Sequence, residues 1–418
     1  MRPIFVRLHR WLGVATALFL FVSGLTGAVI AWDHEIDAWL NPSFFYAKSD
    51  APALAPLELA KRVESADPRV QVTYLPLGVE PGHAVQMMVM PRENPATKAP
   101  FDVDYNQIAV DPATGAVQAK RMWGAVSLAR IDLMPFLYKL HYTLHLPIVG
   151  GFDIGTWLLG IVGIMWFFDS GIALILSFPS VKAWRKSFAF RIKRGGYALT
   201  FDLHRSGGVW IWALLLTVAL TSISMNLSEP VVRPVVSAFS TLSPSFFDNP
   251  ALVRAGPAGS VDATPAQIID AAARDAKREG ITQPMGAIYY APAFQAYGIG
   301  FFAPGQEHGD VGLGNAWFYY NGHTGALAGQ SIPGRGTAGD IFLQAQFPLH
   351  SGRIIGIPGR ILISAVGVAV AVLSITGLMI WLKKRAARRR SSVSRFVWPS
   401  FLRLNRKADL SRQRANIE

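Results

Sequence analysis

The sequence predicts an α-helical integral membrane protein with four transmembrane helices from an internal duplication, plus two external α+β domains. Of its 418 residues, 51% are hydrophobic and only 16% are charged, which is too apolar for an ordinary soluble protein. A bilayer core of about 30 Å takes roughly 20 helical residues to cross. Four apolar segments meet this length: Leu12–Trp32, Phe152–Phe178, Val209–Leu227 and Arg360–Leu382.

The distribution of charge predicts the orientation of these segments. Residues 1–10, 179–206 and 383–418 are strongly enriched in Lys and Arg, whereas residues 33–150 and 228–355 carry more acidic than basic side chains. The positive-inside rule places both termini and the 179–206 loop in the cytoplasm and two large domains outside. The net charge of +13 is therefore a topology signal, with basic ends against anionic lipid, and we expect no nucleic-acid partner.

The second half of the chain repeats features of the first half in the same order. "HRWLGV" from His9 matches "HRSGGV" from His204, and "LHLPIVGG" from Leu144 matches "LHSGRIIG" from Leu349. Such duplication predicts a unit that occurs twice. The predicted segments are transmembrane helices in 1–33, 141–178, 204–228 and 346–383, external domains in 34–140 and 229–345, a basic cytoplasmic loop at 179–203 and a basic, disordered cytoplasmic tail at 384–418.

Each external domain is predicted to pack one helix on a small antiparallel sheet. The helices are Leu54–Pro68 and Thr264–Gly280, the second with a capping threonine, a proline at its first position and a terminal glycine. Alternating apolar runs predict strands at "HAVQMMVM", "QIAVD", "YGIGFFA" and "AWFYYN". The turns "DPATGAV" (Asp111–Val117) and "NGHTGAL" (Asn321–Leu327) correspond to each other in the two halves.

The LHRxxG helix starts, the DPxTG hairpins and the LHxxxxxG segments, in this order, resemble the PepSY-associated transmembrane family over about residues 4–385. This family includes iron-regulated inner-membrane proteins and ferric-siderophore reductases of the FoxB type. The resemblance implies a bacterial inner-membrane protein with periplasmic PepSY-like domains and two b-type haems. It also implies a reductase that passes electrons to ferric siderophores in the periplasm and releases Fe(II).

The absence of cysteine limits the chemistry of any metal centre. The chain has no cysteine, which excludes disulfides, thiolate catalysis, cysteine-ligated iron–sulfur clusters and thioether-attached haem. His9 and His204 are the two histidines on the predicted cytoplasmic side, and each begins a helix that runs outward. Two imidazoles facing each other suit the axial positions of a b-type haem. The alternative is that both are interfacial residues bonded to lipid headgroups.

The outer histidines offer a second haem site. His145 and His350 form a repeat-related pair ahead of the second and fourth spans. His141 shares a helical face with His145, and its repeat counterpart is Gln346. His34 lies at the outer end of the first helix, and either His141 or His34 is an alternative ligand. The remaining histidines are predicted to be turn residues: His83, His308 and His323.

Several charged residues accompany these histidines. Arg10 and Arg205 are candidates to neutralise haem propionates, with positive-inside anchoring as the alternative, and Arg353 and Arg360 are similar candidates on the outer side. Asp169 is an acid inside a span, and intramembrane carboxylates are usually functional. It could relay a proton, touch a cofactor surface or cap the following Ser-Gly break.

Glycines within the spans predict close helix packing. Gly24 and Gly27, and likewise Gly160 and Gly163, lie near one another in single helices, as small residues do at helix contacts in membranes. Close to a haem they would also make room for the porphyrin.

Two functional hypotheses follow. The first is the membrane dihaem reductase, which receives electrons from a quinol or a separate reductase, because no nucleotide-binding motif is present. The alternative is a non-enzymatic PepSY membrane protein that binds or regulates a periplasmic partner. A permease is disfavoured because no broken helices mark a substrate site.

Overall fold

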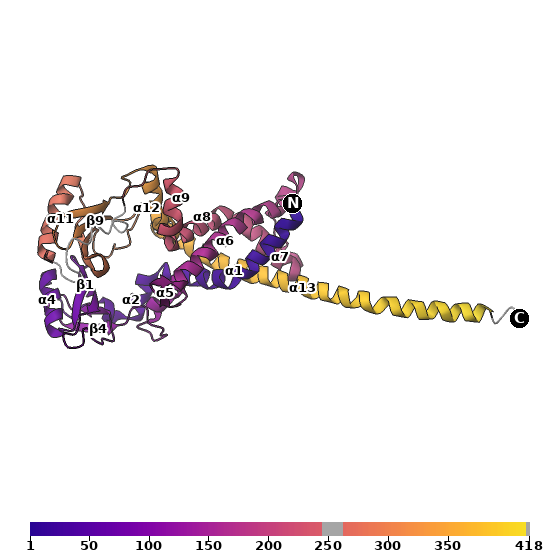
Figure 1. Ribbon diagram of the computed structural model, residues 1–418, viewed down its shortest axis with the longest axis horizontal. Coiled ribbons are helices and arrows are strands. Elements are labelled where there is room, and N and C mark those ends of the chain that lie inside the picture. Colours follow the sequence, from indigo (N-terminus) through magenta and orange to yellow (C-terminus); the bar gives the residue numbers. More distant parts are fainter. Residues whose placement is uncertain (245–261, 415–418) are drawn as a thin grey trace. The chain divides into compact units, whose positions relative to one another are not determined.

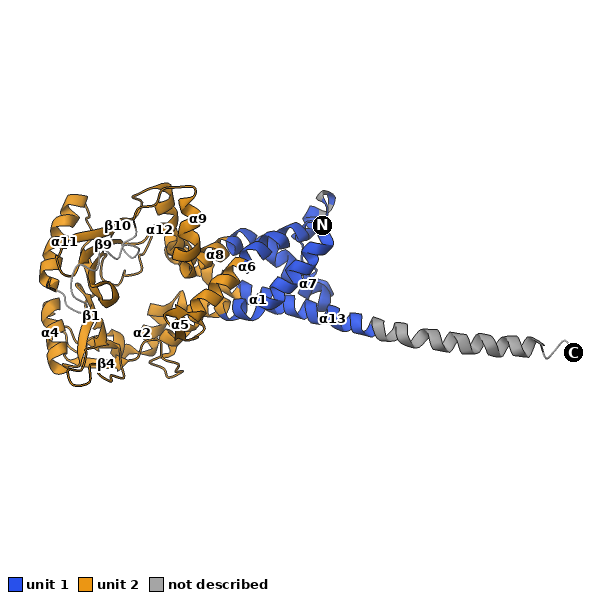
Figure 2. Ribbon diagram, viewed as in Figure 1, with its two compact units in different colours: residues 1–22, 165–216, 369–418 blue, residues 23–164, 217–368 orange. Residues whose placement is uncertain are grey.

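A computed structural model describes residues 1–244 and 262–414 (Figure 1). The chain divides into two compact units (Figure 2). Unit 1 comprises Met1–Val22, Met165–Leu216 and Ala369–Glu418, and unit 2 comprises Ser23–Ile164 and Thr217–Val368.

Three helices are long and apolar enough to cross a membrane, or four if a bent pair counts as one span. They are α1 (Arg2–Ile30), α6 (Ile154–Ser177) and the Ile357–Arg390 part of α13, with mean hydropathies of 2.0, 2.0 and 2.4. The bent pair is α7 (Gly196–Trp210) with α8 (Trp212–Asn226), which meet at 72°. The predicted third span is therefore not straight, and its bend follows the Gly207–Gly208 pair, a common cause of helix kinks.

The basic loop before α7 and the basic C-terminal segment both contain helical structure. The 179–203 region contains the 3-10 helices Val181–Ser187 and Ile192–Arg194 before and beside the start of α7. Helix α13 runs from Ile357 to Arg414, whereas the sequence analysis expects a disordered tail over 384–418.

Unit 2 contains an eight-stranded sheet in the order β10-β9-β8-β7-β1-β2-β3-β4. Both external domains contribute four strands, and they join where β1 pairs antiparallel with β7, with Tyr74 opposite Tyr289. The prediction of two separate sheets is corrected in this respect. The strands are β1 (Val70–Pro76), β2 (Val85–Pro91), β3 (Gln107–Val110), β4 (Val117–Arg121), β7 (Met285–Ala291), β8 (Ala296–Phe301), β9 (Ala316–Asn321) and β10 (Leu327–Ser331).

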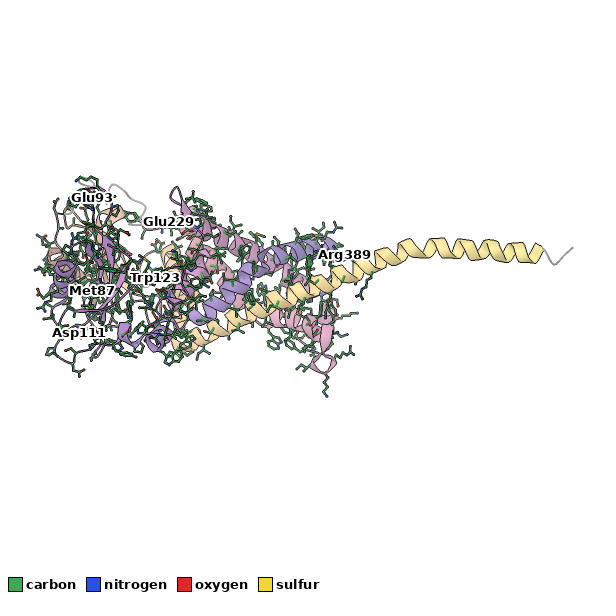
Figure 3. The ribbon with its side chains drawn as sticks, turned by 90° about the horizontal axis from the view of Figure 1, so that it is seen from below. Met87, Glu93, Asp111, Trp123, Glu229 and Arg389 are labelled. Atoms are coloured by element: carbon green, nitrogen blue, oxygen red, sulfur yellow. The ribbon has the colours of Figure 1, made fainter. Side chains whose placement is uncertain are left out.

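Helices α4 (Pro56–Ala66) and α11 (Pro265–Glu279) cover one face of this sheet (Figure 1). Leu59 of α4 and Ile268 of α11 are buried with strand residues in one core. Met87, labelled in Figure 3, belongs to that core and is fully buried. Met87 therefore serves packing on this face, whereas Met88 and Met90 alternate with the buried positions and are only partly buried.

The predicted start and end of α11 are confirmed. Thr264 forms a reciprocal capping box with Gln267, and Gly280 ends the helix in the left-handed conformation with φ 69°. In the sequence, the remaining elements of unit 2 lie between the sheet strands and the spans, except the 3-10 helix Pro292–Phe294, which joins β7 to β8. They are α2 (Asp33–Leu40), α3 (Pro42–Phe45), α5 (Leu133–Thr143), β5 (Ile148–Val149), β6 (Phe152–Asp153), the π-helix Ser228–Val232, α9 (Arg233–Ser237), the 3-10 helices Pro292–Phe294 and Arg353–Ile355, and α12 (Ala338–Ser351).

Glycines bring helices of unit 2 into close contact, as predicted. A Cβ on Gly160 would lie 2.4 Å from Cγ of Leu227, and one on Gly163 would lie 3.2 Å from Cγ1 of Ile223. On α13, a Cβ at Gly367 would lie 2.5 Å from the carbonyl oxygen of Gly24. At Gly367 the absence of a side chain lets two backbones approach, whereas Gly160 and Gly163 make room for the side chains of Leu227 and Ile223.

Candidate cofactor sites

Unit 1 brings His9 of α1 and His204 of α7 together. Their ring centres are 6.0 Å apart, with 43° between the ring planes. A ring nitrogen binds a metal at about 2.0–2.1 Å and the ring centre lies about 1 Å farther back, so two imidazoles on opposite sides of one ion have centres about 6 Å apart. The separation therefore fits two axial ligands of one haem iron.

Hydrogen bonds fix the orientation of both rings. Nδ1 of His9 lies 2.9 and 3.0 Å from the two carboxylate oxygens of Asp169. Nδ1 of His204 lies 3.0 Å from the carbonyl oxygen of Leu373 and 3.4 Å from the hydroxyl of Thr376. Because Nδ1–H donates, the lone pair is on Nε2, the tautomer of a metal-binding histidine. Within the described residues, neither Nε2 makes a hydrogen bond.

A glycine makes room for His204 against α13. A Cβ on Gly377 would lie 2.8 Å from Cε1 of His204. Any side chain at this position would push the imidazole away from its Leu373 acceptor. Gly377 is thus part of the site, although no sequence motif singles it out.

A cavity of about 390 Å³ in unit 1 is lined by both histidines and by Asp169. This volume is within the roughly 300–1,000 Å³ typical of cofactor pockets. Its lining includes Trp166, Trp212 and a group of basic side chains: Arg2, Arg10, Arg205, Lys384 and Arg388. Basic groups beside an otherwise apolar pocket suit a flat apolar cofactor with carboxylate substituents.

The two predicted arginines both reach this cavity but differ in their other contacts. Arg10 also lines a neighbouring hollow with Trp11 and Arg385. Arg205 donates to the carbonyl of Lys186 and lies 3.8 Å from Asp202. Both positions allow contact with an anionic group in the cavity, and Arg205 is the more firmly held.

Unit 2 brings together His141 of α5 and His350 of α12. Their ring centres are again 6.0 Å apart, with 57° between the planes. Nδ1 of His141 lies 3.0 Å from the carbonyl oxygen of Ser23 and 3.1 Å from the hydroxyl of Thr26. Nδ1 of His350 lies 3.0 Å from the hydroxyl of Thr221. In the part of the chain that the structure describes, Nε2 of each is again without a hydrogen bond.

Two further contacts define the surroundings of the histidines in unit 2: one indicates the tautomer of His350, and the other makes room for the ring of His141. The Thr221 hydroxyl donates to the carbonyl oxygen of Thr217 at 2.9 Å, so its oxygen accepts from His350. A Cβ on Gly27 would lie 2.9 Å from Cε1 of His141. Gly27 therefore has the role beside His141 that Gly377 has beside His204.

The other predicted outer ligands lie elsewhere, which corrects the pairing expected from the repeat. His145 stacks on Phe136 with ring centres 4.6 Å apart, and its Nε2 lies 2.9 Å from the Phe136 carbonyl oxygen. His34 packs edge-on against Phe45 at 5.1 Å. Neither ring contacts that of His350 among the described residues.

The outer arginines are engaged with acidic residues. Arg360 lies 2.6 Å from a carboxylate oxygen of Glu35, donates to the carbonyl of Ala31 and lies over the ring of Trp32 at 4.3 Å. Arg353 lies 3.9 Å from Asp33. Their predicted role toward propionates has no support in these contacts.

Family comparison supports a membrane protein with apolar spans. The sequence profile of the PepSY-associated TM region matches residues 6–384. The chain belongs to this family. The match contains both histidine pairs of this PepSY-associated transmembrane protein, together with the residues that orient them. A comparison with curated proteins finds no match.

Proposed function

We propose that this PepSY-associated transmembrane protein is a dihaem b-type reductase of the bacterial inner membrane. It passes electrons across the membrane to ferric siderophores at the periplasmic face and releases Fe(II). The observation that carries the proposal is the geometry of the two pairs, His9 with His204 and His141 with His350. Each pair has ring centres 6.0 Å apart, and all four Nδ1 atoms are hydrogen-bonded while Nε2 is available.

The residues present fit two haems. The four histidines would supply the axial ligands, and the basic group around Arg10 and Arg205 would bind the propionates of the haem in unit 1. When bound, each haem would supply one-electron transfer. The roles of the chain are to orient the imidazoles, to provide apolar walls and to exclude competing ligands.

The proposed reaction needs electrons rather than acid–base groups. Oxidation of one quinol to quinone releases two electrons and two protons, and the two electrons convert two Fe(III) to Fe(II). Fe(II) is the softer ion, so the hard oxygen ligands of a siderophore hold it less tightly. By the charge-based topology, His9 and His204 lie toward the cytoplasmic donor and the domains of unit 2 lie in the periplasm.

The test is to purify the full chain in detergent and record oxidised and dithionite-reduced absorption spectra, with haem counted against protein. A low-spin b-type spectrum with about two haems per chain supports the proposal. Ferric hydroxamate and catecholate complexes are then supplied to the reduced protein, with an Fe(II)-specific chelator as the indicator. A folded protein without haem would overturn the proposal and favour a non-enzymatic role of the periplasmic domains in binding a partner.

A further inference from the structure

Of the four histidines in the two pairs, one has an Nδ1 hydrogen-bond partner that differs in kind from the partners of the other three. Nδ1 of His9 donates to a carboxylate, whereas the other three rings donate to uncharged oxygens. These neutral acceptors are the Leu373 carbonyl and Thr376 hydroxyl for His204, the Ser23 carbonyl and Thr26 hydroxyl for His141, and the Thr221 hydroxyl for His350. The charge on the acceptor therefore distinguishes the site in unit 1 from the site in unit 2.

Asp169 is buried and directed at His9. Its side chain is 11% exposed, and both oxygens lie within 3.0 Å of Nδ1. Among the ion pairs of the described residues, His9 is its single partner. A carboxylate that is largely shielded from water has a strong effect on the imidazole it contacts, because little solvent screens its charge.

The internal repeat shows that a carboxylate is not needed merely to hold the ring. Asp169 lies on α6, the second span, and Thr376 lies on α13, the fourth span. Each contacts the histidine that begins its own half of the repeat: Asp169 contacts His9, and Thr376 contacts His204. Since a neutral acceptor orients His204, the negative charge at Asp169 has a different consequence.

That consequence is electronic. A carboxylate that accepts the Nδ1 proton makes Nε2 a stronger electron donor, and the hydrogen bonding of a haem ligand is one of the ways a protein sets the haem potential. A stronger donor stabilises Fe(III) relative to Fe(II) and so lowers the reduction potential. The hydroxyls and carbonyls beside His141 and His350 have a weaker effect of this kind.

We infer that Asp169 is a positioning residue that gives the haem centre of unit 1 a lower reduction potential than the centre of unit 2. An electron that leaves the first centre oxidises it and reduces the second, and this transfer is then energetically downhill toward the periplasmic domains. The inference rests on the proposed dihaem function and adds a direction to it.

The test replaces Asp169 by Asn in the purified full chain. The amide has almost the same size but no charge. Absorption spectra recorded at controlled potentials give the midpoint of each haem, and a His141→Ala background leaves the unit 1 haem alone for assignment. We expect Asp169→Asn to retain both haems, to shift the unit 1 midpoint to more positive values and to leave the unit 2 midpoint unchanged.

Thr376→Asp provides the reciprocal variant. It places a carboxylate beside His204, on the other side of the same iron, and is expected to shift the unit 1 midpoint to more negative values. Thr221→Val is the matched control at unit 2, where removal of a neutral acceptor should leave the unit 1 midpoint in place.

The outcomes separate the two proposals. A wild-type protein without haem rejects the dihaem function itself. An unchanged or more negative unit 1 midpoint in Asp169→Asn, with both haems retained, overturns the inference alone. If Asp169→Asn loses the unit 1 haem, the Thr376→Asp variant tests the inference instead. An unchanged or more positive unit 1 midpoint in Thr376→Asp overturns the inference about Asp169.

Discussion

His141 on α5 and His350 on α12 face each other with their ring centres 6.0 Å apart, and each is anchored through Nδ1 to a hydroxyl-bearing helix. Thr26 and Thr221 supply those hydroxyls, and Thr26 follows His9 by the same number of residues as Thr221 follows His204. The first span and the bent third span therefore each carry a histidine of one pair and a hydroxyl that contacts a histidine of the other pair. This arrangement explains why a polar residue recurs at both ends of each helix.

The first prediction concerns the outer ligands. His141→Ala or His350→Ala should lower the haem content from about two to about one per chain, since a b-type haem held by two histidines depends on both. His145→Ala and His34→Ala should retain both haems. The measurement is haem per protein by the pyridine haemochrome method, with reduced spectra for the spin state.

Loss of a haem in His145→Ala together with full occupancy in His141→Ala would contradict this assignment. The alternative pairing expected from the repeat would then be correct. The matched variants for unit 1 are His9→Ala and His204→Ala, each of which should remove the other haem.

The second prediction concerns the two glycines beside imidazoles. Gly27→Ala puts a methyl group 2.9 Å from Cε1 of His141, and Gly377→Ala puts one 2.8 Å from Cε1 of His204. Each should displace its ring and weaken one haem, the unit 2 haem for Gly27 and the unit 1 haem for Gly377. Gly171→Ala is the control, because a Cβ there meets nothing within 4 Å. Equal haem retention in all three variants would show that the contacts relax without moving the ligands.

The sequence predicts that His9 and His204 face each other but leaves the partner of His350 open, for a local reason. His9 and His204 follow matching helix starts, so the repeat identifies them directly. On the outer side, "LH" occurs at Leu140–His141 and again at Leu144–His145, and either can be matched to Leu349–His350. In the structure α5 ends at Thr143, and the left-handed φ of 54° at Leu144 turns His145 out of the helix, whereas His141 faces His350.

Contacts between distant elements are also beyond sequence analysis. The contact between His9 and Asp169 joins residues 160 apart and depends on the rotation of α6 about its axis. The pairing of Tyr74 with Tyr289 joins the two predicted sheets, but an alternating strand pattern specifies which face is buried and not which strand lies alongside. Strands and helices were predictable because their patterns are local, whereas these relationships are not.

The third prediction concerns a buried ion pair in unit 2. Arg121 of β4 contacts Asp37 of α2 at 2.7 Å, and their side chains are 4% and 6% exposed. Asp37→Ala leaves the guanidinium buried without its counter-charge and should destabilise the domain by about 3–5 kcal/mol. The measurement is the thermal unfolding midpoint in detergent.

The double variant Asp37→Ala with Arg121→Met serves as the control for this pair. It removes both charges and should restore much of the lost stability, because no unpaired buried charge remains. A double variant less stable than Asp37→Ala would mean that the other contacts of Arg121, with Gln107 and the Ile131 carbonyl, outweigh the ion pair.

The fourth prediction concerns pH. Hydrogen bonds from Arg69 and from the Tyr105 hydroxyl hold the pKa of Asp67 well below its usual value of 3.8. A carboxyl with a lowered folded-state pKa stabilises the fold above the unfolded-state pKa, and this contribution is lost as the pH falls toward the folded-state pKa. Asp67→Asn should therefore lower the unfolding midpoint near pH 6, and the difference from wild type should shrink as the pH falls below about 4. A difference independent of pH would mean that the Asp67 contribution is steric.

The fifth prediction tests the orientation deduced from charge. Because the chain contains no cysteine, single cysteines report accessibility without background. Glu93, labelled in Figure 3, is 63% exposed on unit 2, and Lys193 is exposed in the basic loop before α7. In cells with a permeabilised outer membrane, a membrane-impermeant maleimide should label Glu93→Cys at once and Lys193→Cys only after the inner membrane is opened. The reverse order would place unit 2 in the cytoplasm, where it could not meet an incoming ferric siderophore, and the proposed direction of electron transfer would fail with it.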